Sequence, residues 1–162
     1  MPPIAITDSR LIAAPAEDVG RVAGVVWLCA HGIASPRRAA LAMASCRGRV
    51  LLIADGTGIA ATDRALTAWT EVVAARASRL LLFGPGADGL AERLAAAGHA
   101  AMVVRCSDVG DAAQAAAHLA SRGSTVLLAL PARPSRLADD TAARFRAAVD
   151  ALAMAERPVE VA

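Results

Sequence analysis

The sequence predicts an α/β fold with three layers, in which a mostly parallel sheet of about five or six strands lies between helices. Short apolar runs of strand length alternate with longer, helix-like segments along the 162 residues. The run Val50–Ala54 is apolar without a break, as in a strand that helices cover on both faces. Glycines follow several helical segments, at Gly48, Gly98 and Gly123, where helices are expected to stop. No linker or internal repeat divides the chain, so residues 1–162 are expected to form one domain.

The expected elements alternate along the chain. The strands are short apolar runs at Ile4–Thr7, Ala23–Leu28, Val50–Ala54, Leu80–Phe83, Ala101–Val104 and Thr125–Leu130. The helices lie near Arg37–Ser45, Ala61–Ala77, Leu90–Ala97, Gly110–Ser121 and Asp139–Ala153. In the last helix, Phe145, Val149 and Leu152 recur at helical spacing and share one side. Alternation of this kind is typical of parallel sheets with a helical layer on each face.

Composition excludes several classes of function. Aromatic residues make up only 2% of the chain, which leaves almost no stacking platform for single-stranded nucleic acid. A net charge of +2 with scattered arginines is not typical of a nucleic-acid-binding protein. The apolar runs are too short to span a membrane, and the N-terminus does not resemble a signal peptide. The three cysteines are too few for a disulfide framework, so a reducing cytoplasm is the expected location.

All 17 basic residues are arginine, because the sequence contains no lysine. Asparagine and tyrosine are also missing. Arginine stays protonated in proteins, so it is a poor general base and forms no Schiff base. Without lysine, the sequence contains no phosphate-binding loop of the kind that ends in Gly-Lys-Ser or Gly-Lys-Thr. Its cysteines and histidines also lack the spacing that is typical of zinc sites.

Ligands of open parallel sheets bind beyond the carboxyl ends of the strands. Four loops are expected at that edge: Cys29–Pro36, Asp55–Thr62, Gly84–Gly89 and Pro131–Asp140. In the second loop, Gly56 and Gly58 leave room for a ligand near the main chain, and Thr62 or Asp63 can cap the following helix. This loop is a candidate anion site, although a tight strand-to-helix turn without a ligand explains the same residues.

Two further groups of reactive side chains lie in these loops. Arg133, Ser135 and Arg136 could hold a carboxylate or phosphate, or they could form a solvated surface turn. Cys29 and His31 share one side of an extended chain and could act as a thiol and its base. The alternative for Cys29 is an unreactive buried cysteine, which is more common.

Three blocks of residues resemble the C-terminal domain of the Mur ligases, most closely that of the UDP-N-acetylmuramoyl-alanine glutamate ligase. The first is Asp55-Gly-Thr-Gly-Ile-Ala-Ala-Thr-Asp-Arg-Ala-Leu66, and the second is Leu80-Leu-Leu-Phe-Gly-Pro-Gly-Ala-Asp88. The third is Gly123-Ser-Thr-Val-Leu-Leu-Ala-Leu-Pro-Ala-Arg-Pro-Ser135, with Arg144-Phe-Arg146 after it. The resemblance covers residues 49–154 and implies a Rossmann-like domain, whereas residues 1–48 form an N-terminal extension without a match.

In this family the C-terminal domain binds the incoming amino acid and closes over ATP, and a central domain forms the acyl phosphate. By position, the resemblance implies ligand contacts at Asp55, Thr57, Thr62, Asp88 and Ser135. With the loop glycines and arginines, the expected ligand-binding set is Asp55, Gly56, Thr57, Gly58, Thr62, Gly84, Gly86, Asp88, Arg133, Ser135 and Arg136. The sequence departs from the family where Gly58 or Ile59 replaces an asparagine or histidine, and where the second loop lacks a lysine.

These departures favour a non-catalytic binding or assembly module that acts through a protein partner or as a homo-oligomer. No catalytic or metal-binding residue is expected, and ATP with Mg²⁺ could bind only with a partner domain. The alternative is a subunit that completes an ATP-dependent peptide ligase in trans by binding the amino acid or nucleotide. A third hypothesis is a small-molecule sensor that anchors its ligand through Arg133 and Arg136.

Overall fold

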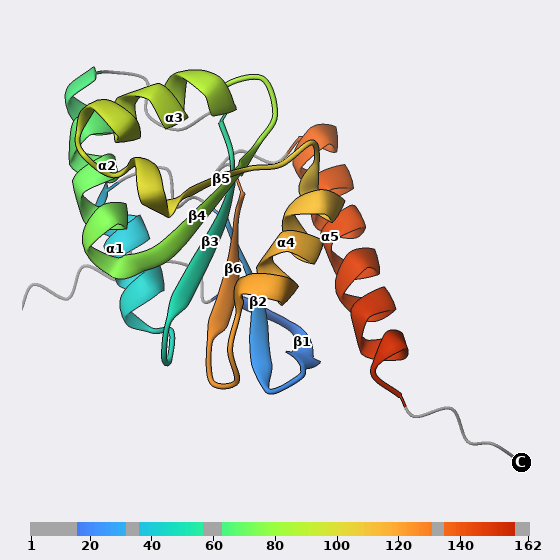
Figure 1. The fold of residues 1–162 in the computed structure, drawn as a ribbon. Helices are drawn as coiled ribbons and strands as arrows, with labels where there is room; N and C mark the ends of the chain where they lie inside the picture. The colour runs from blue at the N-terminus through green and yellow to red at the C-terminus, as the bar shows by residue number, and fades with distance from the viewer. Residues whose placement is uncertain (1–15, 32–35, 57–62, 131–134, 158–162) are drawn as a thin grey trace, which may run out of the picture.

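The computed structural model describes residues 16–31, 36–56, 63–130 and 135–157. These residues form six strands and five α-helices, as expected for an α/β protein (Figure 1). The strands are β1 (Glu17–Val22), β2 (Val25–His31), β3 (Val50–Asp55), β4 (Ala77–Phe83), β5 (Val103–Arg105) and β6 (Thr125–Leu130). The helices are α1 (Pro36–Ala44), α2 (Asp63–Arg76), α3 (Ala87–Ala96), α4 (Val109–Leu119) and α5 (Arg136–Ala155).

The strands form one sheet in the order β1-β2-β6-β3-β4-β5. Five of them run parallel, and only β1 pairs with its neighbour β2 in the antiparallel direction. The predicted mostly parallel sheet is therefore confirmed. Parallel strands need crossover connections, and helices supply them here. As a result the carboxyl ends of β2, β6, β3 and β4 meet at one edge of the sheet.

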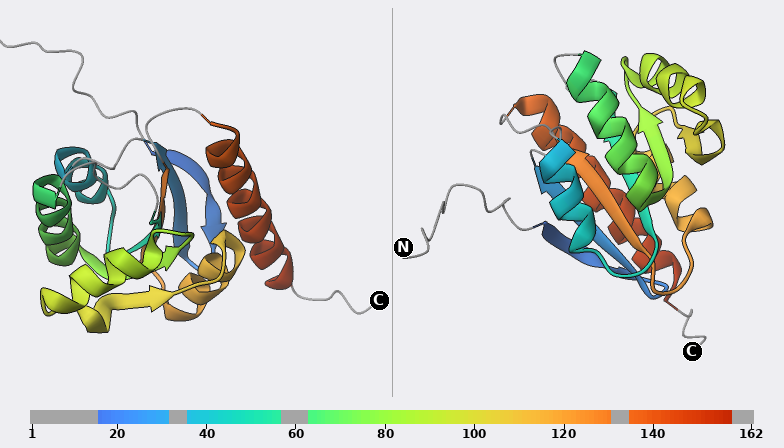
Figure 2. Two further views of the ribbon diagram at one scale, coloured as in Figure 1. Left: turned by 90° about the horizontal axis from the view of Figure 1, so that it is seen from above. Right: turned by 90° about the vertical axis from the view of Figure 1, so that its left-hand side faces the viewer.

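Two helical layers cover the sheet, with α1, α2 and α3 on one face and α4 and α5 on the other (Figures 1 and 2). Alternate residues of the central strands supply the two cores. Leu52 points to the layer that contains Trp69 of α2, whereas Ile53 points to the layer that contains Phe145 of α5. All four side chains are fully buried. The predicted buried strand and the predicted apolar side of the last helix are thus confirmed.

The edge of the sheet near the N-terminus differs from the prediction. A single strand was expected at Ala23–Leu28, but Ala23 and Gly24 form a turn with φ angles of 52° and 75°. This turn joins β2 to β1, a strand that the apolar pattern does not reveal because it carries exposed charges such as Glu17 and Arg21. The predicted strand Ile4–Thr7 lies outside the described residues.

Smaller differences occur at other element ends. Residues Ala100–Met102 form a turn of 3₁₀ helix, so β5 begins only at Val103 and is shorter than the predicted Ala101–Val104. The last helix begins at Arg136, three residues before the predicted Asp139, because Ser135 caps it. The predicted helix stop at Gly98 is confirmed, because Gly98 directly follows the C-cap residue of α3, Ala97, and has a φ angle of 85°. Gly48 and Gly123 also have positive φ angles, 68° and 87°, but α1 ends at Ala44 and the C-cap of α4 is Ala120, so these two glycines lie in the loops that follow and do not end the helices.

Among the described helices, none combines the length and the apolar character that crossing a membrane requires.

Candidate functional site

The carboxyl ends of the parallel strands bring two glycine loops together. The amide of Gly56, after β3, donates a hydrogen bond of 3.0 Å to the carbonyl of Phe83 at the end of β4. A Cβ atom on Gly56 would overlap the peptide bond between Gly86 and Ala87. The backbones therefore approach each other so closely that position 56 requires glycine.

Gly84 makes the second close contact between these loops. Its φ angle is 82°, and a Cβ atom there would overlap the carboxylate of Asp55. The carbonyl of Gly84 accepts a hydrogen bond of 3.1 Å from the amide of Ala87, where α3 begins. The structure thus brings together four residues of the expected ligand set, namely Asp55, Gly56, Gly84 and Gly86.

A cavity of about 220 Å³ opens beside these loops, between α2 and α3. It is lined by Gly56, Leu66, Gly86, Gly89, Leu90 and Arg93. Of these residues, Leu66, Gly89, Leu90 and Arg93 were not in the predicted ligand-binding set. All four belong to helices, Leu66 to α2 and the other three to α3. Whether they face the same cavity depends on the rotation of each helix about its axis, which the sequence does not determine. Arg93 is the cationic group of this cavity, and its guanidinium could hold a carboxylate or phosphate.

Two other expected ligand contacts interact with the chain itself. Asp88 forms an ion pair with Arg105 at the end of β5. Ser135 is the N-cap residue of α5, and its hydroxyl oxygen accepts a hydrogen bond of 3.1 Å from the amide of Ala138. Arg136 follows as the first helical residue and is exposed. Thr57, Gly58, Thr62 and Arg133 lie outside the described residues.

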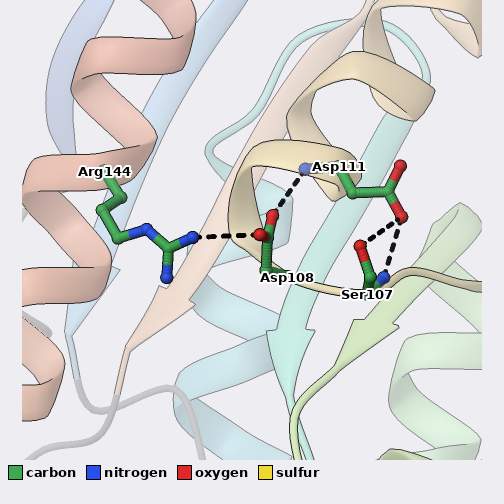
Figure 3. Close-up of polar contacts among 4 residues, drawn as sticks. All are labelled: Ser107, Asp108, Asp111 and Arg144. Carbon is green, nitrogen blue, oxygen red and sulfur yellow. Dashed lines mark hydrogen bonds and ion pairs between the residues drawn. The ribbon is translucent and has the colours of Figure 1, made fainter.

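A polar cluster that the sequence analysis missed lies at the start of α4 (Figure 3). One carboxylate oxygen of Asp108 accepts a hydrogen bond of 2.8 Å from the amide of Asp111. The other accepts one of 3.0 Å from Arg144 of α5. Asp111 in turn accepts hydrogen bonds from the amide and the hydroxyl of Ser107, at 2.8 and 3.1 Å. The cluster fixes the start of α4 and ties it to α5.

The hydrogen bond from the Asp111 amide is the main reason why the pKa of the Asp108 carboxyl is lowered, and the charge of Arg144 adds to the effect. The signal was present in the sequence. An aspartate directly before the apolar Val109, with an acid three residues later, is typical of a helix N-terminus. The prediction instead began this helix at Gly110.

The cysteines do not form a reactive group with His31. Cys29 is 1% exposed, and burial raises the pKa of its thiol to about 11. The thiol is therefore protonated at neutral pH, whereas His31 is exposed at the end of β2. Burial also raises the pKa of Cys106 to about 11, and the charges of Asp111 and Asp108 act in the same direction. Of the two alternatives for Cys29, a reactive thiol beside His31 or an unreactive buried cysteine, the structure supports the unreactive cysteine.

Within the described ranges, no group of three or more histidine, cysteine, aspartate or glutamate side chains could hold a metal ion.

No protein-family model matches the chain, and no curated protein matches its sequence. Solved structures do match. A domain from a Haemophilus ducreyi protein assigned as a UDP-N-acetylmuramate:L-alanyl-gamma-D-glutamyl-meso-diaminopimelate ligase is 15% identical, with a TM-score of 0.55. The match covers 85% of this chain and 98% of that domain.

Complete ligases also match, each over about a third of its length. A UDP-N-acetylmuramoyl-L-alanyl-D-glutamate–2,6-diaminopimelate ligase is 17% identical with a TM-score of 0.57, over 88% of this chain and 33% of that one. The MurF ligase from Thermotoga maritima, solved in complex with ADP, is 15% identical with a TM-score of 0.54, over 85% and 32%. Identities this low show the fold alone. The chain therefore has the Rossmann-like α/β fold of the Mur ligase C-terminal domain.

Proposed function

We propose that this chain is a non-catalytic binding or assembly module with the fold of the Mur ligase C-terminal domain, acting through a protein partner or through self-association. One observation carries the proposal: polar groups at the expected ligand edge are used by the chain itself. Asp88 is paired with Arg105, Ser135 caps α5, and the carboxylate of Asp55 lies against Gly84. These contacts give each of the three residues a structural role that does not require a substrate.

Sequence composition supports the same proposal. The resemblance places a lysine in the second glycine loop of the ligases, and this chain has no lysine at all. A fold can persist while its site is lost, because function depends on the site and not on the scaffold. The three cysteines carry free thiols, which supports a location in the reducing cytoplasm.

The test is an activity and association assay on the purified chain. The proposal expects no ATP hydrolysis and no joining of amino acids, with or without Mg²⁺. It also expects a mass above that of the 16.4 kDa monomer in sedimentation equilibrium, either alone or after co-purification from the native host. Hydrolysis of ATP by the chain alone would contradict the non-catalytic function. A strictly monomeric chain without any partner would contradict the assembly function.

A second candidate function is supported by the cavity between α2 and α3. Gly56, Gly86 and Arg93 line it, and a guanidinium side chain can bind a small carboxylate or phosphate through two parallel hydrogen bonds. In this alternative the chain completes an ATP-dependent peptide ligase in trans by binding the amino acid or nucleotide.

Complementation separates the two functions. The chain would be added to a Mur ligase from which the C-terminal domain has been deleted. The trans-subunit function expects restored ligation that Arg93→Gln abolishes, while the matched change Arg79→Gln, at the far end of β4, leaves it intact. The binding-module function expects no ligation with any of these variants.

A further inference from the structure

The edge of the sheet opposite the candidate site has an unusual charge. Four arginines directly precede β6, β3 and β4, and we call them the basic rim: Arg122, Arg47 and Arg49 lie in loops, and Arg76 is the last residue of α2. All four residues are exposed. Because β6, β3 and β4 are direct neighbours in the sheet, the rim runs across three adjacent strands. Neighbouring strands lie about 4.8 Å apart, so the loops form one continuous row.

Hydrogen bonds hold these loops against one another. Thr125, the first residue of β6, donates from its amide to the Arg49 carbonyl at 2.8 Å and from its hydroxyl to the Arg47 carbonyl at 2.7 Å. The amide of Gly123 donates to the carbonyl of Gly24 at 2.9 Å, in the β1–β2 turn. The α1–β3 and α4–β6 loops and this turn lie together at the lower edge of the sheet (Figure 1). The backbone of the rim is thus fixed, while its guanidinium groups stay exposed.

Within the described ranges, these charges are not neutralised. Among the described residues, no carboxylate pairs with the side chains of Arg47, Arg49, Arg76 or Arg122. By contrast, Arg105, Arg144 and Arg146 each pair with a carboxylate elsewhere in the molecule. The carboxylate of Glu156 lies at the β1–β2 turn, where one of its oxygens accepts a hydrogen bond of 2.7 Å from the amide of Ala23.

Helix geometry explains only part of the rim. Arg76 is the last residue of α2, where a cation is stabilised by the helix dipole. Arg47, Arg49 and Arg122 lie beyond the ends of α1 and α4, where the dipole effect has faded. The side chain of Arg122 lies against Gly24 in the β1–β2 turn. Exposed charges without a partner add little to folding stability, so the described contacts show no structural role for the guanidinium groups of Arg47 and Arg49.

We propose that the basic rim is a docking surface for an acidic segment of a protein partner. Guanidinium groups bind carboxylates through two parallel hydrogen bonds. A nucleic acid fits less well, because single strands also need aromatic stacking and the chain is only 2% aromatic. This inference rests on the proposed function, whose partner it describes.

The test uses a fluorescein-labelled octapeptide of alternating glutamate and alanine, measured by fluorescence anisotropy at low salt. We expect saturable binding that weakens as salt is raised. The double variant Arg47→Glu/Arg49→Glu should weaken binding about tenfold or more, since each lost pair costs a few-fold and reversal adds repulsion. The matched control is Arg37→Glu/Arg64→Glu, two exposed arginines at the start of α1 and α2, which should change binding less than about twofold.

Both double variants lower the net charge by four units, from +2 to −2, so a difference between them reports position and not total charge. Arg47→Gln/Arg49→Gln removes the charges without reversal and should show an intermediate loss, which guards against misfolding of the Glu variant. Equal loss in both double variants, or no binding of the peptide by the unchanged protein, would overturn the proposal.

Two competing probes decide the partner class. An eight-nucleotide DNA strand or a vesicle with phosphatidylserine that binds the rim more tightly than the peptide would also overturn it. The outcome is separate from the proposed function. If the chain self-associates but does not bind the peptide, the proposal for the basic rim is wrong and the assembly function stands. If the chain hydrolyses ATP, the non-catalytic function is wrong, and the result of the peptide measurement is unaffected.

Discussion

The two edges of the sheet use their polar residues in different ways. At the carboxyl edge, glycine backbones interlock and polar side chains cap helices or form ion pairs, as Ser135, Asp88 and Asp108 do. At the amino edge, arginines such as Arg47 and Arg49 extend from loops whose backbones are fixed, and no described carboxylate neutralises them. The difference suggests that the first edge stabilises the fold and the second is available for a partner.

The largest effect is expected at Gly56. A Cβ atom there would overlap the Gly86–Ala87 peptide bond, so Gly56→Ala should lower the free energy of unfolding by about 2–3 kcal/mol. Urea unfolding followed by circular dichroism measures this. The control is Gly89→Ala in α3, where a Cβ atom meets nothing within 4 Å, and which should stabilise the chain by about 0.5–1 kcal/mol. An unchanged free energy for Gly56→Ala would show that the two loops are not tightly interlocked.

A smaller effect is expected at Ser135. Loss of its capping hydroxyl in Ser135→Ala should lower the free energy of unfolding by about 1 kcal/mol. Ser135→Asp should retain the stability, because aspartate is an equally good N-cap residue. If Ser135 only bound a ligand, both substitutions would leave the free energy of unfolding unchanged. That result would favour a ligand-binding role for Ser135.

The contribution of Asp108 to the free energy of unfolding is expected to depend on pH. Its pKa is lowered in the folded chain, so its charged form contributes stability above the pKa of the unfolded chain. That contribution is lost as the pH falls through the folded pKa, in a window below about pH 4. Asp108→Asn keeps a capping oxygen and removes the charge. Its free energy of unfolding should therefore be lower than that of the unchanged chain at pH 7, and the difference should disappear near pH 2. A difference that persists near pH 2 would show that charge is not its cause.

The smallest effect is expected at the basic rim. Arg47→Gln and Arg49→Gln should each change the free energy of unfolding by less than about 0.5 kcal/mol, because exposed charges without partners contribute little. Thermal unfolding at low and moderate salt measures this. A loss of 1 kcal/mol or more would mean that the rim stabilises the fold, and the contrast between the two edges would fail.

Most of the fold follows from the sequence because buried parallel strands have an unmistakable apolar pattern. Val50–Ala54 and Thr125–Leu130 are covered on both faces, so almost every residue in them is apolar. The strand β1 was missed for the opposite reason. It lies at the edge of the sheet, where charged side chains such as Asp18 reach water, and its pairing with β2 depends on a turn at Ala23.

The candidate site was predictable only in part. The loops that contain Gly56 and Gly86 were expected at the same edge of the sheet, and the parallel pairing of β3 with β4 in the structure brings the two glycines into contact. The contribution of Arg93 depends on the rotation of α3 about its axis, and one sequence does not determine that rotation. The ion pair between Asp88 and Arg105 joins residues on separate elements that no local pattern connects.

Calorimetric titration of the purified chain with MgADP, and separately with glutamate and diaminopimelate, tests most directly whether the carboxyl edge serves the fold alone. Polar groups that are already used within the chain predict no saturable heat for any of these compounds up to millimolar concentration. A saturable heat that Arg93→Gln abolishes would show an intact ligand site between α2 and α3, and would contradict the claim that the carboxyl edge serves the fold alone.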